Sequence, residues 1–258
     1  MPGKNVKLVS FIRHGEGYHN VAGAKHPSNY GSYEYEDAHL TDLGHKQAAL
    51  LRRHVASVGL RVELVVVSPL TRTLETAVGI FGGATWREGE ASPPLMVAAT
   101  AVPGKVSNRA SVSAHNCPPF IAHELCREII GVNPCDKRRT VTHYAQQHPG
   151  IDFSLMTTEA DCCWTREARE SLPAIMGRAL GFVEWLMSRP EQHIAVVSHC
   201  EFLHCVMNVL EHRDDHDRSL SKWFANCEMR TLVLGDGAGD LWAGAAGEIY
   251  QQLFPYLS

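Results

Sequence analysis

The sequence predicts an α/β protein, a three-layer α/β/α sandwich with a mainly parallel sheet. Three apolar runs carry this prediction: VKLVSFI at 6–12, VELVVV at 62–67 and HIAVVSH at 193–199. Continuous runs of β-branched residues are typical of strands that are covered on both faces. A segment with helical spacing comes after each run along the chain, and strands that alternate with helices favour a parallel sheet.

Two helices are predicted in the first third of the chain. Residues 42–57 carry apolar side chains at helical spacing, and Thr41 precedes them as a capping residue for the first turn. Residues 69–81 are predicted to form a helix directly after Ser68. Pro69 then takes an early helical position, where its missing N–H costs little.

The later elements are predicted from the same rules of spacing and punctuation. They are helices at 120–131, from near Lys137, at 166–188 and at 201–210, and a strand RTLVL at 230–234 that closes the sheet. The helix at 166–188 has to tolerate Pro173 near its start. These expectations describe a sheet with helices distributed along the whole chain.

Between the second and third helices, the texture of the sequence changes. Residues 82–119 contain five prolines, a Gly-Gly pair and many small residues, which is typical of an irregular excursion. Within it we expect at most one strand, at LMVAA (95–99). The chain has no internal repeat and no linker long enough to divide it, so we expect residues 1–258 to form a single domain.

Composition excludes several classes of function. The chain has 258 residues, 45% of them hydrophobic and 20% charged, with a net charge of -4. No Lys/Arg block is present of the kind that binds nucleic acid or an anionic membrane surface. The longest apolar runs are too short to cross a bilayer, and the N-terminus lacks the pattern of a secretion signal. We therefore expect a cytoplasmic protein with neither nucleic acid nor membrane as a partner.

The cysteine and histidine residues are candidates for disulfide bonds and metal sites. The eight cysteines include no C-x-x-C pair, so we expect reduced, structural thiols. His212 and His216 lie four residues apart, a spacing that suits a metal on a helix, but no third ligand accompanies them. We therefore expect no metal and no cofactor.

Potentially cationic side chains lie at the ends of the predicted strands. Arg13 and His14 follow the strand at 6–12, and His199 is the last residue of the strand at 193–199. Arg72 lies one turn into the helix that follows the strand at 62–67. In parallel sheets, ligands bind beyond the carboxyl ends of the strands, so these four groups are expected to converge. Such a cluster repels itself unless a multiply charged anion fills it, and arginine matches phosphate oxygens in bidentate fashion.

Smaller groups near the first strand complete the predicted anion site. Gly15 and Gly17 are expected to let backbone N–H groups approach the anion, and Asn20 offers an uncharged donor. A neutral imidazole in such a site is a competent nucleophile toward phosphorus. The leaving oxygen needs a proton from a carboxylic acid of raised pKa, and the surrounding cations make a metal unnecessary.

Four ordered motifs resemble the histidine phosphatase superfamily, in its phosphoglycerate mutase-like branch. They are RHG at 13–15, LTDLGHKQA at 40–48, SPLTRTLETA at 68–77 and VVSHCEFL at 196–203. The segment from PPLM to CDKRR is similar to phosphoglycerate mutase-like proteins of plants and protists. The resemblance implies a phosphoglycerate mutase-like fold and a small phosphorylated substrate.

The resemblance also implies roles for individual residues. His14 matches the histidine that becomes phosphorylated, while Arg13, Arg72 and His199 match the rest of the phosphate pocket, and Asn20 matches a further phosphate ligand. The family places its general acid in a stretch like L-x-E-x-x-x-G. Here ELCREIIG offers Glu128 and Glu124. Being four residues apart on the expected helix, both can face the same side, and we prefer Glu128.

Three functions remain open at this point. The first is a metal-independent phosphomonoester phosphatase with a phosphohistidine intermediate. The second is a cofactor-dependent phosphoglycerate mutase, but the arginine- and proline-rich insertion of mutases is absent. The third is a catalytically weak phosphate-binding protein, which the unusual Cys200-Glu201 pair keeps open. The physiological substrate and the oligomeric state stay unknown.

Two further groups have an open role. His19 takes a place where mutases of the family usually carry a bulky aromatic residue, so it either contacts substrate or lies at the polar rim. The basic run at 137–139 either binds a second charged group of the substrate or begins a solvated helix.

Overall fold

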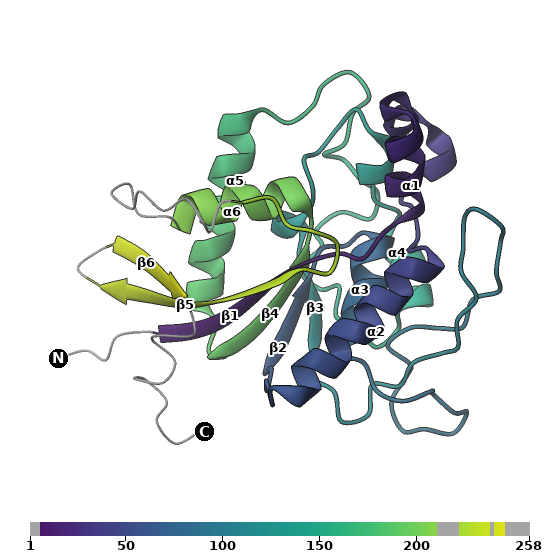
Figure 1. Cartoon of the computed structure of the whole chain (residues 1–258), viewed down its shortest axis with the longest axis horizontal. Coiled ribbons are helices and arrows are strands. Elements are labelled where there is room, and N and C mark those ends of the chain that lie inside the picture. Colours follow the sequence, from purple (N-terminus) through teal and green to yellow (C-terminus); the bar gives the residue numbers. More distant parts are fainter. Residues whose placement is uncertain (1–5, 211–221, 238–239, 246–258) are drawn as a thin grey trace.

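The computed structural model describes residues 6–210, 222–237 and 240–245 (Figure 1). Strands and helices alternate along the chain. In chain order the strands are β1 (Val6–Arg13), β2 (Leu64–Val67), β3 (Phe120–Ala122), β4 (His193–Ser198), β5 (Met229–Gly237) and β6 (Asp240–Ala245). The α-helices are α1 (Tyr18–Lys25), α2 (Asp42–Ser57), α3 (Thr71–Phe81), α4 (Val141–Gln147), α5 (Leu172–Ser188) and α6 (Cys200–Leu210). Short 3₁₀ helices lie at Pro27–Gly31, Tyr33–Tyr35, Glu124–Cys126 and Pro134–Asp136.

The described strands form one sheet in the order β3-β2-β4-β1-β5-β6. Strands β3, β2, β4 and β1 run parallel, whereas β5 pairs antiparallel with β1 and β6 with β5. The register of β1 and β4 places Arg13 opposite Ser198. Because both strands end there, the next residues of each chain segment emerge at the same edge of the sheet.

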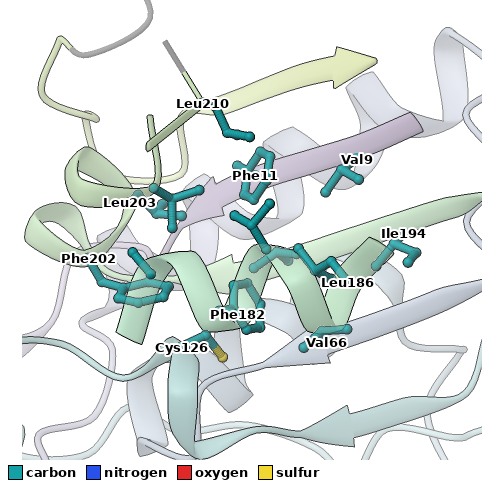
Figure 2. Close-up of a cluster of buried hydrophobic side chains, with 14 of the residues drawn as sticks. Val9, Phe11, Val66, Cys126, Phe182, Leu186, Ile194, Phe202, Leu203 and Leu210 are labelled. Carbon is teal, nitrogen blue, oxygen red and sulfur yellow. The ribbon is translucent and has the colours of Figure 1, made fainter. Parts of the chain in front are cut away.

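Helices cover both faces of the sheet, so the molecule has three layers. Helices α5 and α6 pack on one face and α2, α3 and α4 on the other (Figure 1). Alternation along β1 divides the core: Val9 and Phe11 face α5 and α6, while Ile12 faces the opposite layer. Figure 2 shows the hydrophobic cluster on the face covered by α5 and α6, in which Phe182 and Leu186 of α5 lie against the sheet. The predicted three-layer α/β fold is therefore confirmed.

The helix boundaries agree with the sequence prediction for α2 and differ from it at the starts of α5 and α3. Helix α2 has the predicted bounds, and the hydroxyl of Thr41 accepts the backbone N–H of Gly44. Helix α5 begins at Leu172, six residues later than expected, because Ser171 caps it and Pro173 lies in its first turn, where no N–H is needed. Helix α3 likewise begins at Thr71 rather than directly after Ser68.

The predicted helix at 120–131 is wrong. Residues Phe120–Ala122 pair with β2 as the edge strand β3, and Glu124–Cys126 form a single 3₁₀ turn. Pairing with the exposed edge of β2 outweighed the helical spacing of the apolar residues, which is a non-local effect. Glu124 and Glu128 therefore do not share a helix face.

Smaller predictions also need correction. The helix expected near Lys137 begins at Val141, after the 3₁₀ turn Pro134–Asp136. LMVAA forms only isolated bridges, to Val112 and Arg109, and no regular strand. The strand RTLVL, part of β5, does not close the sheet because β6 adds a further antiparallel strand beyond it. Within the described residues, no helix is long and apolar enough to span a membrane.

Candidate active site

A pocket of about 330 Å³ lies beyond the carboxyl ends of β1 and β4. It collects residues from several segments that are far apart in the chain. Its lining is Arg13, His14, His19, Asn20, Tyr30, Arg72, Glu128, Asn133, Cys135, Asp136, Arg169, Cys200, Glu201 and Trp223. Parallel sheets place ligand sites at this edge, and the strand ends in the sequence predict the same location.

His14 lines the pocket directly after β1, with 2% of its surface exposed. Its Nδ1 donates to the carbonyl of Gly15 at 2.7 Å, and its Nε2 accepts from Nε of Arg72 at 3.3 Å. Burial, followed by the charges of Arg72 and Arg13, holds the pKa of His14 well below its usual value. The imidazole is therefore neutral, with the lone pair of Nε2 facing the arginine.

Arg13 and His199 have unused hydrogen-bonding capacity beside His14. Arg13 donates through Nη1 to the carbonyl of Phe224 at 2.7 Å, and Nε2 of His199 bonds the hydroxyl of Ser68 at 2.7 Å. Among the described residues, Nε of Arg13 and Nδ1 of His199 are buried without a hydrogen-bond partner. Arg13 lines the pocket, whereas His199 is fully buried and does not line it, with its ring 5.2 Å from that of His14.

Arg72 is held in place by an unexpected partner. Its Nη2 donates to Oδ1 of Asp136 at 2.9 Å, and its Nη1 donates to the carbonyl of Cys135. Both charged side chains are almost completely buried. The sequence motifs indicate Arg72 as a ligand of the anion but do not point to Asp136, which lies at no strand end.

Glu128 is a carboxyl group that lines the same pocket as His14. Its Oε1 accepts the backbone N–H of Phe202 at 3.2 Å, at the N-terminus of α6. Burial, followed by the negative charges of Asp136 and Glu201, raises the pKa of Glu128 to about 7. A carboxyl group with this pKa exists in both protonation states near neutral pH.

Glu124, the alternative acid, points elsewhere. Its Oε1 pairs with Nε of Arg138 at 2.5 Å and its Oε2 with Nη1 of Arg127 at 3.0 Å, and it does not line the pocket. Both arginines are buried, and the carboxylates of Glu124 and Asp161 together balance their charges. The structure thus brings Glu128, and not Glu124, together with His14.

Asn20 and His19 line the pocket, whereas Gly15 and Gly17 do not. Oδ1 of Asn20 accepts from the backbone N–H of Gly17, which leaves its amide group toward the pocket. The N–H of Gly15 donates to Thr76 instead of facing the pocket, and a Cβ on Gly15 would lie 2.7 Å from the carbonyl oxygen of Gly44. His19 is buried, with its ring 5.6 Å from that of His14, so it is not a rim residue.

The basic run at 137–139 does not line the pocket. Arg138 is buried and bonded to Glu124 and to loop carbonyls, while Lys137 and Arg139 pair with Glu36 at 3.4 and 3.3 Å. Arg169, in contrast, lines the pocket together with Arg13 and Arg72. It lies 3.7 Å from Asp136 and 3.8 Å from Glu201, whose side chain is 41% exposed.

The pocket is also lined by Trp223, Tyr30 and Asn133, which no sequence motif predicted. Within the described ranges, no cluster of three or more His, Cys, Asp or Glu residues could hold a metal ion. His212 and His216 lie outside the described residues.

Comparison with known proteins agrees with the resemblance in the motifs. The model of the histidine phosphatase superfamily (branch 1) matches residues 9–89 and 138–243. The unmatched segment between them contains Glu128 and Asp136. Similar proteins include two from Arabidopsis thaliana, "phosphoglycerate mutase-like protein" and "phosphoglycerate mutase-like protein 1". The first is 45% identical and covers 89% of this chain and 85% of its own length; the second is 44% identical and covers 89% and 82%.

A solved structure agrees with the fold. The α-ribazole phosphatase from Shigella flexneri aligns with a TM-score of 0.51 at 16% identity, over 92% of this chain and 95% of its own. Because so few residues are identical, this likeness concerns the architecture alone. The family match and the Arabidopsis relatives go further: the chain belongs to the histidine phosphatase superfamily, branch 1.

Proposed function

We propose that the protein is a metal-independent phosphomonoester phosphatase that acts through a phosphohistidine at His14. The observation that carries the proposal is the 2.7 Å contact between Nδ1 of His14 and the carbonyl of Gly15. The Nδ1–H of His14 is committed to that carbonyl, so Nε2 holds the lone pair that a nucleophile needs. Arg72 contacts that nitrogen at 3.3 Å and is placed to receive the phosphoryl group beside it.

The first step uses the charges around His14. A phosphoryl group entering the pocket replaces the lone pair of Nε2 as the partner of Nε of Arg72. Arg13, which lines the pocket, supplies further contacts to the phosphoryl oxygens, and His199 completes the site beside His14, with the two rings 5.2 Å apart. Preorganised donors of this kind stabilise the charge of the transition state without reorganisation, which is the role that a metal has in other phosphatases.

Glu128 is proposed to move the protons of both half-reactions. With a pKa of about 7, it protonates the leaving oxygen as His14 is phosphorylated. The resulting carboxylate then takes a proton from the water that attacks the phosphohistidine, and inorganic phosphate leaves. One carboxyl group thus serves as acid and then as base.

The alternative is phosphoglycerate mutase activity, in which the phosphoryl group returns to another substrate hydroxyl. The names of the Arabidopsis relatives favour it. A mutase must keep water away from its phosphohistidine. Against it, the described pocket carries a partly exposed carboxylate, Glu201, at its mouth, and the chain lacks the arginine- and proline-rich insertion of mutases.

A third possibility is a weak phosphate-binding protein. This would require the pocket to lack a nucleophile or an acid, and both His14 and Glu128 line it. The cytoplasmic location and the small phosphorylated substrate stay part of the proposal.

The deciding assay incubates the protein with 3-phosphoglycerate and 2,3-bisphosphoglycerate and follows free phosphate and 2-phosphoglycerate together. We expect phosphate as the main product, with no effect of a chelator. 2-Phosphoglycerate formed faster than phosphate would make the mutase correct. Phosphate binding without turnover on any of a panel of phosphomonoesters would make the protein a binding protein. His14→Ala is the inactive control.

A further inference from the structure

Two adjacent cysteines lie in the loop between α4 and α5, which also carries Arg169 of the pocket lining. Cys162 and Cys163 are both exposed, and their sulfur atoms are 4.0 Å apart. The thiol of Cys162 also contacts the hydroxyl of Thr158 at 3.5 Å. All eight cysteines of the chain are free thiols, and these two are the exposed ones.

The backbone of the cysteine pair is tied to Asp161. Its Oδ1 accepts the N–H groups of Cys163 and Trp164, each at 3.1 Å. The same carboxylate binds Arg127 at 2.6 Å, and both of these side chains are at most 2% exposed. Any change in the peptide between the two cysteines therefore acts on a buried ion pair.

From this ion pair, a chain of hydrogen bonds leads to the candidate active site. Nη2 of Arg127 donates to the carbonyl of Asp136 at 2.9 Å, and the carboxylate of Asp136 holds Arg72 at 2.9 Å. A second connection runs through Trp164, whose indole N–H donates to the carbonyl of Asn133 in the pocket lining. The cysteine pair is thus linked to two parts of the pocket.

We propose that Cys162 and Cys163 form a modification site at which a hydroperoxide oxidises both thiols to a vicinal disulfide, and that this oxidation lowers turnover. The thiolate of Cys162 attacks the peroxide, the O–O bond breaks, and a sulfenic acid and water form. The thiol of Cys163 then attacks that sulfur, the S–O bond breaks, and a second water leaves. Two thiols and one hydrogen peroxide thus give one disulfide and two waters.

The order of the two steps depends on the surroundings of each thiol. Hydrogen bonds with Thr158 and Cys163 lower the pKa of Cys162, whereas burial raises the pKa of Cys163. Cys162 therefore reacts with peroxide first, and Cys163 resolves the sulfenic acid.

Ring closure changes the backbone at the Asp161 contact. Successive Cα atoms are about 3.8 Å apart across a trans peptide, below the roughly 4.4 Å that disulfides usually span. The eight-membered ring of a vicinal disulfide therefore closes only when the dihedral angles around the Cys162–Cys163 peptide change, and the N–H of this peptide is the group that donates to Asp161. Loss of that hydrogen bond weakens the contact between Asp161 and Arg127. Because Arg127 also binds the carbonyl of Asp136, the position of Asp136 beside Arg72 then becomes less well fixed.

The effect on turnover rests on the proposed function, but the chemistry can be measured without it. The experiment treats the full-length wild type, Cys162→Ser and Cys163→Ser with one equivalent of hydrogen peroxide. Cys117→Ser is the matched control, because Cys117 is a partly exposed thiol away from the pocket. Readouts are thiol alkylation with peptide mass mapping, turnover of p-nitrophenyl phosphate, and affinity for inorganic phosphate by calorimetry.

In the wild type and in Cys117→Ser, we expect the peptide containing both cysteines to lose two hydrogens. Turnover falls about tenfold, and dithiothreitol restores it. Both serine variants, Cys162→Ser and Cys163→Ser, keep their activity after the peroxide treatment.

Stepwise oxygen addition without loss of hydrogen would overturn the site, as would dimers linked through these thiols. A disulfide that changes neither turnover nor phosphate affinity would overturn the coupling, and so would inactivation that persists in both serine variants. An untreated protein that hydrolyses nothing would refute the proposed function, while the mass map and the phosphate affinity still decide this inference.

Discussion

Replacement of Glu128 by glutamine tests the assignment of the general acid. Glutamine keeps the shape of the side chain and can still accept from the N–H of Phe202, but it cannot release a proton. For alkyl phosphates, whose leaving oxygen needs a proton, kcat/KM should fall by about 10²- to 10⁴-fold. For p-nitrophenyl phosphate the loss should be much smaller, because that oxygen leaves without protonation.

The magnitude depends on the pKa of Glu128, which rises from 4.5 to about 7. At pH 7 about half of the molecules then carry the proton, against roughly 0.3% for an ordinary glutamate. Because only the protonated form is an acid, kcat/KM for alkyl phosphates should be level below pH 7 and fall about tenfold per pH unit above it. The Glu128→Gln variant should lack this basic limb.

Glu124→Gln is the matched control. Glu124 contacts Arg127 and Arg138 and does not line the pocket, so its replacement should leave the basic limb near pH 7 in place. The assay is kcat/KM from pH 5 to about 9 for one alkyl and one aryl phosphate, in all three proteins. The assignment would be refuted if Glu128→Gln kept the limb and alkyl activity within tenfold of wild type, or if Glu124→Gln lost both.

Three further outcomes are expected. Asp136→Asn removes a charge that raises the pKa of Glu128, so the basic limb should move to lower pH; a move to higher pH would contradict this cause. Glu75 is buried between Arg109 and His39, with a pKa lowered to about 2 by these partners against the cost of burial. Glu75→Gln should therefore lose about 3–5 kcal/mol in urea unfolding at pH 7. The difference from wild type should shrink as pH falls from about 4.5 toward 2, because the wild-type carboxylate becomes protonated there. Finally, turnover should survive dialysis against a chelator, and loss that added metal restores would show a metal requirement.

The sequence predicted the location of the site because that location depends on strand ends. Continuous apolar runs mark β1 and β4 unambiguously, and parallel strands deliver the residues after them to one edge. Arg13 and His14 therefore line the pocket as expected, and Arg72 comes with the helix after β2, while His199 lies beside His14 with the two rings 5.2 Å apart. Thr41 is a similar case, because a capping residue acts on its own turn.

Non-local pairing explains the parts that the sequence could not supply. Residues 120–122 become a strand because β2 offers a free edge to them, and the spacing within that segment carries no trace of that edge. Glu124 and Glu128 differ by their partners, two buried arginines for one and the N-terminus of α6 for the other. A motif that contains both glutamates cannot separate these surroundings.

Asp136 is the clearest omission. A carboxylate beside an expected phosphate site is electrostatically unfavourable, so the sequence does not suggest one there. The residues around Asp136 also give no sign of its contact with Arg72, which lies 64 residues earlier. The structure shows that it holds Arg72 and raises the pKa of Glu128. Both effects depend on the 3₁₀ turn Pro134–Asp136, which lies between the two helices expected at 120–131 and from near Lys137 and was not itself predicted.

The central claim is that His14 attacks phosphorus, and rapid quenching tests it most directly. The protein is mixed with excess p-nitrophenyl phosphate, stopped within the first turnover at alkaline pH to preserve phosphohistidine, and mapped by peptide mass. We predict one added phosphoryl group on the peptide that contains His14, located on that residue by fragmentation and absent from His14→Ala. Turnover with no phosphorylated intermediate, or with the phosphoryl group on another residue, would contradict the claim.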